Sequence, residues 1–357
     1  MADRAQALVQ RLPELEADAI VVTSLVNVRY LTGFTGSSGL VVIGPQTRVF
    51  ATDFRYREQS AAEVDSGFDR RIVTTDLLDE VGDALPAGPL TIAFEDGTMT
   101  VRDHARLAET LGDRVSLVPA GSPVQELRAV KAPDEVRRIA AAAELADAAL
   151  RDIMAQGLVG RTELEVAQTL ERAMLDRGAQ AASFQSIVAA GPHGALPHAQ
   201  PRDAAIDAGE LVVVDWGARL DGYCSDCTRT LATGDLTDEA HAGYELVREA
   251  QLAGLAAIRP RAGGRDVDAA AREVIEKAGH GEHFGHGLGH GVGLEVHEAP
   301  RLSWRSDSVL ADGNIVTVEP GVYLPGRFGV RIEDLVHVTD AGAEILTGVP
   351  KELITVG

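Results

Sequence analysis

The 357-residue sequence lacks the features that would place it in a membrane or outside the cell. No apolar run approaches the roughly 18 residues of a membrane-spanning helix. The first residues, MADRAQALVQRLPELEADAI, are charged and amphipathic rather than typical of a secretory signal. We therefore expect a cytoplasmic protein with no membrane partner.

Basic residues are scarce, because 33 Lys and Arg stand against 54 Asp and Glu, for a net charge of −21. Such a charge repels nucleic acids and anionic membranes, so we expect no nucleic-acid partner. Phosphate-binding motifs are missing too, since the cluster NVRYLTGFTGSSG at 27–39 contains neither G-K-[ST] nor G-x-G-x-x-G. We expect this segment to form a turn.

Cysteine is almost absent. The only two, Cys224 and Cys227, have the C-x-x-C spacing of redox and zinc motifs. They fall in a stretch with the pattern of a strand, where side chains three residues apart point to opposite faces and cannot share a metal. We expect two reduced, small apolar side chains, as is usual in a cytosolic protein.

The length and the 45% apolar content are sufficient for two domains, and no internal repeat is evident. The first domain, residues 1–123, alternates helical patterns with short apolar runs, which predicts an α/β domain. The second, residues 124–357, opens with helical patterns at 124–156 and 162–175. In the first domain the helical patterns lie at 2–16, 55–64 and 100–111, and the apolar runs at Ala19–Thr23, Leu40–Ile43 and Arg48–Thr52.

The segment HFGHGLGHGVGLEVHEAPR, at 283–301, holds four of the ten histidines and five glycines at alternate positions. Neither a packed helix nor a regular strand tolerates so many glycines, whereas a loop gains close backbone approach from them. We expect a shaped loop that directs imidazoles at a binding partner. A histidine loop alone does not make a metal site, which also needs acidic groups.

Acidic groups occur in ELVVVDWGARLDGYCSDCTRTL, at 210–231, where two strand-like runs flank an Asp-Gly pair. Asp-Gly between such runs is a strong signal for a two-residue hairpin turn. The register that follows places Asp226 opposite Gly217, with Asp215 pointing to the same face. Two like charges buried side by side are costly unless a cation lies between them.

A second hairpin is predicted in NIVTVEPGVYLPGRFGVRIEDLVHV, at 314–338, where a turn near Gly326 sets Glu319 opposite Glu333. Apolar neighbours in VVVDWG and VTVEPG favour buried acids over an exposed ladder of charges. With His290, the set contains four carboxylates and one imidazole, which suits two divalent cations, Mn²⁺ first and Co²⁺ or Zn²⁺ as alternatives. Two metals about 3.5 to 4 Å apart indicate hydrolysis by a shared hydroxide.

The blocks VVVDWGARLDGYCSDCTRT, GHGLGHGVGLEVHEAP, VTVEPGVY and VRIED resemble the pita-bread metallopeptidases, which include methionine aminopeptidase, aminopeptidase P, prolidase and the metal-free relative creatinase. YLTGFTGSSG and TDFRY upstream, with HEAP after the histidine loop, resemble the proline-specific branch. The resemblance implies a creatinase-like α/β N-terminal domain and an α+β pita-bread catalytic domain. It also implies a homodimer, in which the first domain packs beside the partner's active site and limits substrate length.

The resemblance implies a role for each ligand. Asp226 and Glu333 would bridge two metals and Asp215 would bind the second, while His290 and Glu319 would complete the first. Glu319 would also be the general base that carries a proton from the bridging water to the leaving proline nitrogen.

The same resemblance assigns residues to the substrate. His198 and His297 would contact the scissile carbonyl, and His286 would lie in the same pocket. Arg331, within VRIED, would orient Glu333. Arg301, directly after HEAP, lies where some prolidases place an arginine that pairs with the free carboxylate of a dipeptide; a position on the outer face of the loop is the alternative.

The implied activity is that of an Xaa-Pro aminopeptidase, whose partners are small peptides with proline at the second position. Prolidase, which cuts Xaa-Pro dipeptides only, is the alternative enzyme, and a non-catalytic peptide-binding protein on the same fold is a distant one. The intact set of five ligands argues against the last. Because the N-terminal resemblance spans more residues than one arginine, aminopeptidase P-like cleavage with some dipeptidase activity is favoured.

Overall fold

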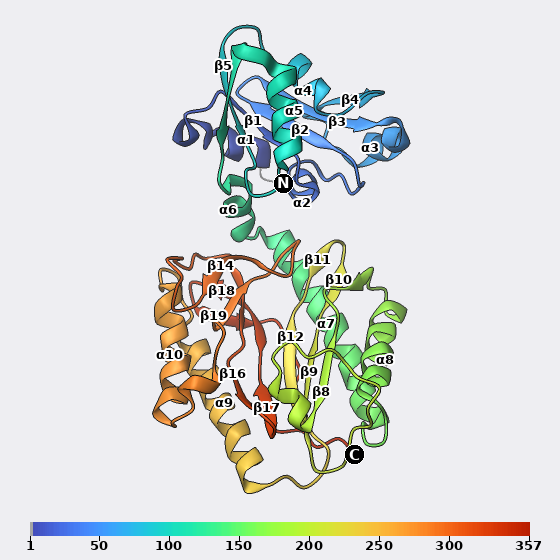
Figure 1. Cartoon of the computed structure of the whole chain (residues 1–357), viewed down its shortest axis with the longest axis vertical. Coiled ribbons are helices and arrows are strands. Elements are labelled where there is room, and N and C mark those ends of the chain that lie inside the picture. The colour runs from blue at the N-terminus through green and yellow to red at the C-terminus, as the bar shows by residue number, and fades with distance from the viewer. Residues whose placement is uncertain (1–2) are drawn as a thin grey trace. The chain divides into compact units, whose positions relative to one another are not determined.

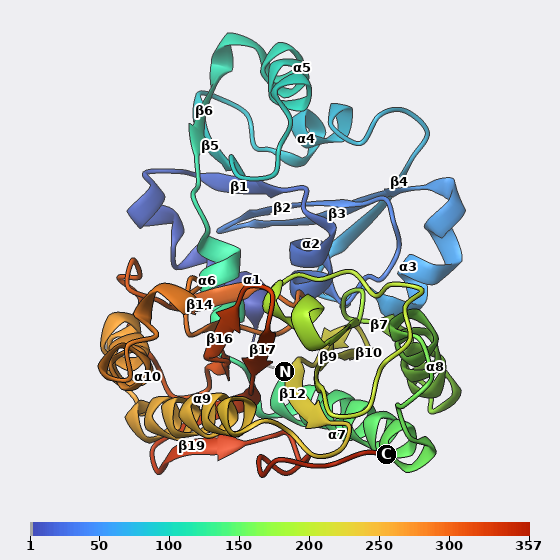
Figure 2. The same cartoon turned by 60° about the horizontal axis from the view of Figure 1, so that its bottom comes forward.

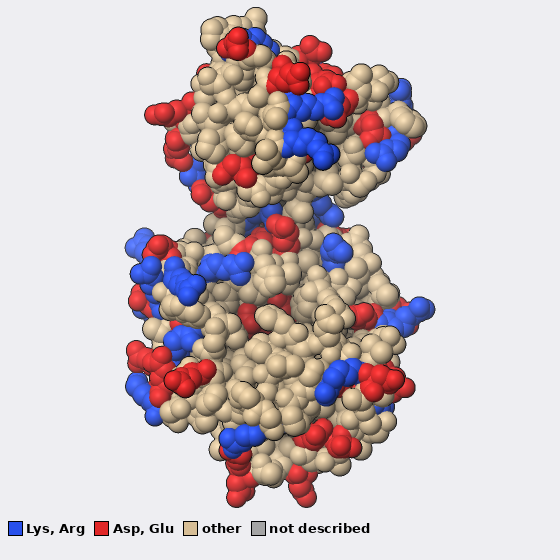
Figure 3. Space-filling model, in the orientation of Figure 1, with Lys and Arg blue, Asp and Glu red and all other residues tan. Residues whose placement is uncertain are grey.

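The computed structural model describes residues 3–357 and divides the chain into two compact units, the first ending at Arg128 and the second running from Ala129 to Gly357. The boundary expected at 123/124 falls at the start of helix α6 (Pro123–Ala129), slightly earlier. Within the described residues, none of the helices combines the length and the apolar composition that crossing a bilayer requires. Acidic and basic side chains are interspersed over the face shown in Figure 3.

A six-stranded sheet forms the centre of the first unit, in the order β4-β3-β2-β1-β5-β6 (Figure 1). Its strands are parallel except for β2, which runs antiparallel to β1 and β3. Strands β1 and β2 are buried along their whole length, as their continuous apolar sequences AIVV and LVVIG predict. The strands are β1 Ala19–Val22, β2 Leu40–Gly44, β3 Thr47–Asp53, β4 Asp69–Val73, β5 Leu90–Phe94 and β6 Val115–Pro119.

The helices of the first unit confirm the patterns at 55–64 and 100–111, and that at 2–16 within the described residues, which begin at residue 3. The turn expected over 27–39 is wrong in its first part, which belongs to helix α2. Asn27, Val28 and Leu31 form a buried helical face, and Gly33 ends the helix at φ 86°. The elements are α1 Arg4–Val9, η1 Leu12–Leu15, α2 Leu25–Thr32, η2 Phe54–Tyr56, α3 Arg57–Glu63, α4 Asp79–Ala84, α5 Val101–Leu111, η3 Gly112–Arg114 and α6.

The second unit places two pairs of helices on the outer sides of its strands (Figures 1 and 2). Helices α7 and α8 share a core with β8, β9 and β12, whereas α9 and α10 share a core with β15 to β18. This arrangement is the α+β pita-bread architecture expected for the catalytic domain. The helices are α7 Pro133–Gln156, α8 Glu163–Asp176, η4 Gly191–Ala195, α9 Asp238–Ala257, α10 Gly264–Lys277 and η5 Gly281–His283.

The strands of the second unit form short sheets in the orders β11-β10-β7, β12-β9-β8, β14-β13-β15-β18-β19 and β16-β17. The first group is β7 Ala181–Ala182, β8 Ile187–Ala190, β9 Leu211–Trp216, β10 Ala218–Leu220, β11 Tyr223–Cys224 and β12 Cys227–Ala232. The second is β13 Gly289–Gly291, β14 Glu298–Leu302, β15 Ile315–Val318, β16 Gly321–Leu324, β17 Phe328–Arg331, β18 Asp334–Thr339 and β19 Gly342–Ile345.

Both predicted hairpins have the expected register. In the first, Leu220 pairs with Tyr223 across the Asp-Gly turn, and Asp215 pairs with Thr228. In the second, the pairs on either side of the two glutamates are Val318 with Asp334 and Gly321 with Arg331. Glu319 and Glu333 therefore fall at opposing positions, as the turn near residue 326 predicts.

Neither hairpin consists of the long continuous strands that its pattern predicts. Asp226 lies between β11 and β12, Glu319 between β15 and β16, and Glu333 between β17 and β18. The cause is that the main-chain N–H groups of the two glutamates donate to other segments and not to the facing strand of their own hairpin. Glu333 N–H donates to the Thr228 carbonyl at 3.0 Å, and Glu319 N–H donates to the Leu288 carbonyl at 2.8 Å. The ladders are thus interrupted at three of the acids.

The two cysteines are free and buried, as expected. Burial raises the pKa of Cys224 to about 11, and it also raises the pKa of Cys227. Both remain thiols at neutral pH, and each Sγ donates a weak hydrogen bond to a main-chain carbonyl, Cys224 to Leu294 and Cys227 to Glu333.

Candidate metal centre

The second unit contains a cavity of about 520 Å³ that brings all the predicted site residues together. These come from β9, from the two interrupted hairpins, from the 283–301 segment and from the loop after η4. They are His198, Asp215, Asp226, His286, His290, His297, Arg301, Glu319, Arg331 and Glu333.

The five predicted ligands lie close enough to share bound ions. Asp215, Asp226 and Glu333 each present a carboxylate oxygen within 4.8 Å of the others. His290 Nε2 lies 3.6 Å from Asp226 Oδ2 and 3.2 Å from Glu319 Oε1. The carboxylates that the two hairpins supply therefore meet at one place, with an imidazole from β13 beside them.

Thr228 connects the two hairpins at this point. It lies opposite Asp215 in the first hairpin, and its hydroxyl donates to Glu333 Oε2 at 2.6 Å. The same hydroxyl accepts a bond from Arg331 Nε at 3.0 Å. A threonine thus fixes the carboxylate of a glutamate that is distant in sequence, which the strand patterns do not reveal.

The electrostatics of the cluster are unfavourable without a cation. Burial raises the pKa of Asp226, and the negative Glu333 and Asp215 raise it further. The pKa of Glu333 is raised by burial and by Glu319 and Asp215. Burial also raises the pKa of Asp215, although Arg331 opposes that shift. Either protons or bound cations must neutralise these groups.

The donors fit divalent ions. Asp215 Oδ1 is buried and has no hydrogen-bond partner among the described residues, which is costly for a carboxylate oxygen unless a ligand occupies its lone pairs. Carboxylate oxygens suit hard divalent cations, and one imidazole among them is compatible with Mn²⁺, Co²⁺ or Zn²⁺. The site is therefore a candidate for two divalent metals.

His286 and His297 line the cavity around the carboxylates, as His198 also does. The ring of His297 lies 4.4 Å from that of His290, and burial, with the neighbouring His290 and Arg301, lowers the pKa of His297 to about 4. Burial also lowers the pKa of His286, whose Nε2 lies 2.9 Å from the Tyr323 hydroxyl. Both rings are neutral at pH 7 and can each donate one N–H.

The loop that carries His198 is anchored by Glu163 at the start of α8. The Glu163 side chain is fully buried and accepts bonds from Arg202 Nη2 at 2.8 Å, from Arg202 Nε at 3.0 Å and from the Ala190 N–H at 3.0 Å. His193 Nδ1 lies 2.9 Å from the same carboxylate. His193 is therefore structural, and the anchor holds both ends of the segment that contains His198.

Comparison with known proteins decides the family. Residues 137–340 match metallopeptidase family M24, and residues 4–130 match the creatinase/prolidase N-terminal domain. The chain belongs to metallopeptidase family M24. It is 42% identical to the uncharacterized peptidase YqhT of Bacillus subtilis over 96% of both chains.

Solved structures of M24 relatives have the same fold over nearly the whole chain. An Xaa-Pro dipeptidase from Bacillus anthracis is 40% identical, covers 99% of both chains and superposes with a TM-score of 0.95. An X-Pro aminopeptidase from Thermotoga maritima is 36% identical, covers 97% of this chain and 100% of its own, and has a TM-score of 0.89.

Arg331 makes a direct contact that the sequence did not predict. The arginine was expected to orient Glu333, but its Nη2 donates to Asp215 Oδ2 at 2.6 Å, and it reaches Glu333 only through Thr228. Its Nη1 donates to the Tyr323 hydroxyl at 3.0 Å. Arg331 thus contacts Asp215 directly and Glu333 through Thr228, because the facing hairpin brings Asp215, more than a hundred residues away, closer than the neighbour in sequence.

Tyr323 is a site residue that sequence reasoning missed. It lines the cavity, is fully engaged with His286 and Arg331, and follows Glu319 by four positions on the same hairpin. This even spacing along a strand pattern was the available signal, because it places the two side chains on one face. Burial raises the pKa of Tyr323, so the hydroxyl keeps its proton.

The expectation that 283–301 contains no regular strand was wrong, because β13 and most of β14 lie in this segment and pair with each other, with a register shift after His290. The glycines allow close approach between these strands and their neighbours. A Cβ on Gly289 would clash with the Thr317 carbonyl, and one on Gly291 with the Ala299 carbonyl. Gly285, by contrast, has open space around it.

This contrast gives a matched pair of variants. Gly289→Ala is expected to lower the free energy of unfolding by about 1–3 kcal/mol, because a main-chain carbonyl must move. Gly285→Ala is expected to change it by less than about 0.5 kcal/mol. Urea unfolding of the two variants measures both values, and equal effects would contradict the close-approach role of the glycine at 289.

Proposed function

We propose that this M24 chain removes the N-terminal residue from peptides with proline at the second position, as aminopeptidase P does, and that it has some activity on Xaa-Pro dipeptides. The observation that carries the proposal is the convergence of four carboxylates and one imidazole in one buried cavity. The Xaa-Pro dipeptidase and X-Pro aminopeptidase among its relatives support proline at the second position.

In this proposal five residues hold two divalent ions. They would be Asp215, Asp226, His290, Glu319 and Glu333. Mn²⁺ is the proposed metal because carboxylate oxygens dominate the set, with Co²⁺ or Zn²⁺ as alternatives. The ions would supply Lewis acidity and lower the pKa of a water shared between them.

Glu319 is the proposed general base. Thr317 Oγ1 donates to Glu319 Oε1 at 3.0 Å, and His290 approaches the same oxygen. Oε2 is therefore the oxygen proposed to accept a proton from the attacking water and to pass it to the leaving proline nitrogen. The Glu319 side chain is 17% exposed, against 7% for Asp226, so it has the better access to the cavity.

The remaining cavity residues are proposed to hold the peptide. His198 and His297 would each donate an N–H hydrogen bond to the oxygen of the scissile carbonyl, which gains negative charge in the transition state. His286, from the 283–301 segment, and Tyr323, on the second hairpin, form a hydrogen-bonded pair. Arg331 orients both Asp215 and Tyr323, so that it joins the metal ligands to the substrate pocket.

Removal of metal tests the hydrolytic centre directly. Dialysis against a chelator should abolish cleavage of Ala-Pro-Ala, and added Mn²⁺ or Co²⁺ should restore it, because the carboxylates lose the cations that neutralise them. Steady-state assays with parallel metal analysis measure both steps. Full activity in protein shown to be metal-free would exclude a dinuclear mechanism.

Asp226→Asn separates the role of this ligand from stability. Activity should fall by orders of magnitude, while the metal-free variant should unfold at an equal or higher urea concentration, because one of several buried like charges is gone. The exposed Asp235→Asn serves as the control and should alter neither property. Loss of the folded state in metal-free Asp226→Asn would contradict this account.

The length of peptide is the open choice within the proposal. Prolidase remains the second candidate because Arg301 lines the cavity, paired with His290 across β13 and β14. A guanidinium at that position can bind the carboxylate of a dipeptide with two parallel hydrogen bonds. Resemblance of the first unit to that of aminopeptidase P favours longer peptides.

Values of kcat/KM for Ala-Pro and Ala-Pro-Ala, in the wild type and in Arg301→Ala, decide between the candidates. We expect cleavage of both by the wild type, with the tripeptide preferred, and a selective loss of dipeptide cleavage in the variant. Cleavage of the dipeptide alone would establish the prolidase. Equal losses for the two substrates would remove the carboxylate-binding role of the arginine.

We further propose a cytoplasmic homodimer. All the predicted site residues belong to the second unit, and the resemblance assigns the first unit a place beside the active site of a partner. Light scattering of the full chain at micromolar concentration should give twice the mass of one chain. A single-chain mass at that concentration would contradict the proposal.

A further inference from the structure

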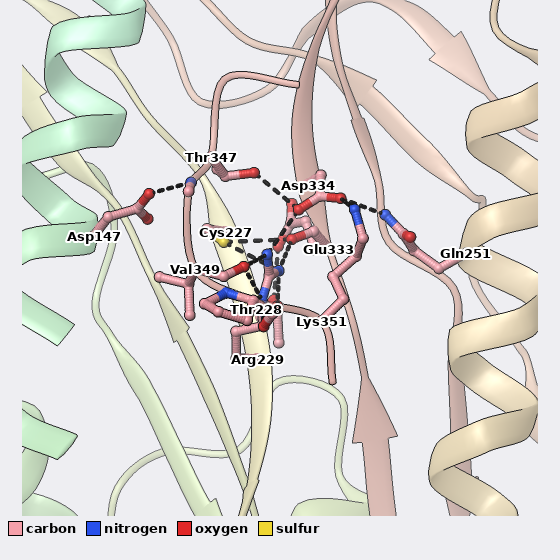
Figure 4. Close-up of polar contacts among 12 residues, drawn as sticks. Asp147, Cys227, Thr228, Arg229, Gln251, Glu333, Asp334, Thr347, Val349 and Lys351 are labelled. Atoms are coloured by element: carbon pink, nitrogen blue, oxygen red, sulfur yellow. Dashed lines mark hydrogen bonds and ion pairs between the residues drawn. The ribbon is translucent and has the colours of Figure 1, made fainter. Parts of the chain in front are cut away.

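A second polar cluster surrounds the main chain of Glu333, one of the proposed metal ligands (Figure 4). Its centre is Arg229, whose side chain is 1% exposed. Because side chains alternate along β12, Arg229 lies on the face opposite to Thr228, which contacts the Glu333 carboxylate. Arg229 Nη2 donates to Asp334 Oδ1 at 2.8 Å.

Asp334 is held by more than this arginine. Its carboxylate accepts bonds from Lys351 Nζ at 2.6 Å, from Gln251 Nε2 at 2.8 Å and from the Thr347 hydroxyl at 2.9 Å. The donors come from helix α9 and from the segment after β19. Buried on every side, the carboxylate has one well-defined position.

Arg229 also binds main-chain carbonyls of three segments. It donates to Thr228 at 2.9 Å, to Val349 at 3.1 Å and to Pro350 at 3.0 Å, and it donates to Glu333 as well. A guanidinium has five N–H donors in a fixed plane, so one side chain can hold two strands and the segment at 347–351 together. A lysine, with three donors on one nitrogen, cannot reproduce this geometry.

Glu333 needs such a partner because it lies in the interruption between β17 and β18. Buried main-chain groups outside a ladder must find other hydrogen bonds. Here the Glu333 N–H donates to the Thr228 carbonyl, and the Glu333 carbonyl accepts from Arg229 and from Cys227 Sγ. With the Thr228 hydroxyl on its carboxylate, the glutamate is bound at both ends by β12.

We propose that Arg229, oriented by Asp334, is a positioning residue of the metal centre. It fixes the main chain of Glu333 against β12 and makes metal affinity depend on the contact with the segment at 347–351. Neither Arg229 nor Asp334 is among the described residues that line the cavity, so both act through Glu333. The inference rests on the metal centre of the proposed function.

Calorimetric titration of chelator-treated protein with Mn²⁺ tests this role without an activity assay. Arg229→Lys should bind Mn²⁺ about 10- to 100-fold more weakly than the wild type, since loss of an outer contact displaces a ligand. Arg114→Lys is the matched control, because Arg114 also donates to main-chain carbonyls, those of Gly82, Pro86 and Gly88, but in the first unit. Its Mn²⁺ affinity should equal that of the wild type.

Urea unfolding of the same metal-free samples separates affinity from stability. Asp334→Asn keeps the shape of the side chain but removes the charge that holds Arg229, so it should weaken Mn²⁺ binding by a smaller factor than Arg229→Lys does. If Arg229→Lys does not fold, the Mn²⁺ affinity of Asp334→Asn alone tests the positioning role. Wild-type affinity in folded forms of both variants would overturn the inference and leave the proposed function intact. A wild-type protein that binds no Mn²⁺, Co²⁺ or Zn²⁺ would overturn the metal centre itself.

Discussion

Repulsion among buried carboxylates is the constraint on which the second unit depends. Asp215, Asp226 and Glu333 lie within mutual reach and have raised pKa values because burial and their neighbours disfavour the charged forms. One guanidinium, that of Arg331, cannot balance them. The remaining negative charge favours the binding of divalent cations at these carboxylates.

Two apolar cores hold the charges together. One lies between α7, α8 and the first hairpin, and the other between α9, α10 and the second hairpin. Each core contains a cluster of buried Val, Leu and Ile side chains, whose removal from water contributes favourable free energy to folding. The acids project from the inner edges of these cores, where the two hairpins face each other.

Most of this arrangement could be predicted from local sequence. The Asp-Gly turn determined the register that pairs Asp215 with Thr228, and the glycine turn near 326 determined the register at Glu319 and Glu333. Turn residues and two-residue periodicity act over short distances in the sequence, so the registers of the two hairpins could be predicted from local sequence. Helix α2 was missed because its short buried face precedes a run of glycines and hydroxyls.

Contacts between distant segments were not predictable in the same way. Arg331 binds Asp215 rather than Glu333, and Arg229 joins β12 to the segment at 347–351, although no local pattern announces either partner. The interruptions in the strands have the same origin, since the Thr228 and Leu288 carbonyls accept the main-chain N–H bonds of Glu333 and Glu319. These features arise only when distant segments of the second unit meet.

That meeting has a kinetic consequence. Thr228 and Glu333 are separated by 105 residues, and contacts between such distant positions form late in folding because loop closure must come first. Neither half of the second unit supplies all four carboxylates of the cavity by itself, so an ion has no complete site in a half-folded chain. Metal would then bind only after the two halves have come together, so that it would act mainly by slowing unfolding rather than by speeding folding.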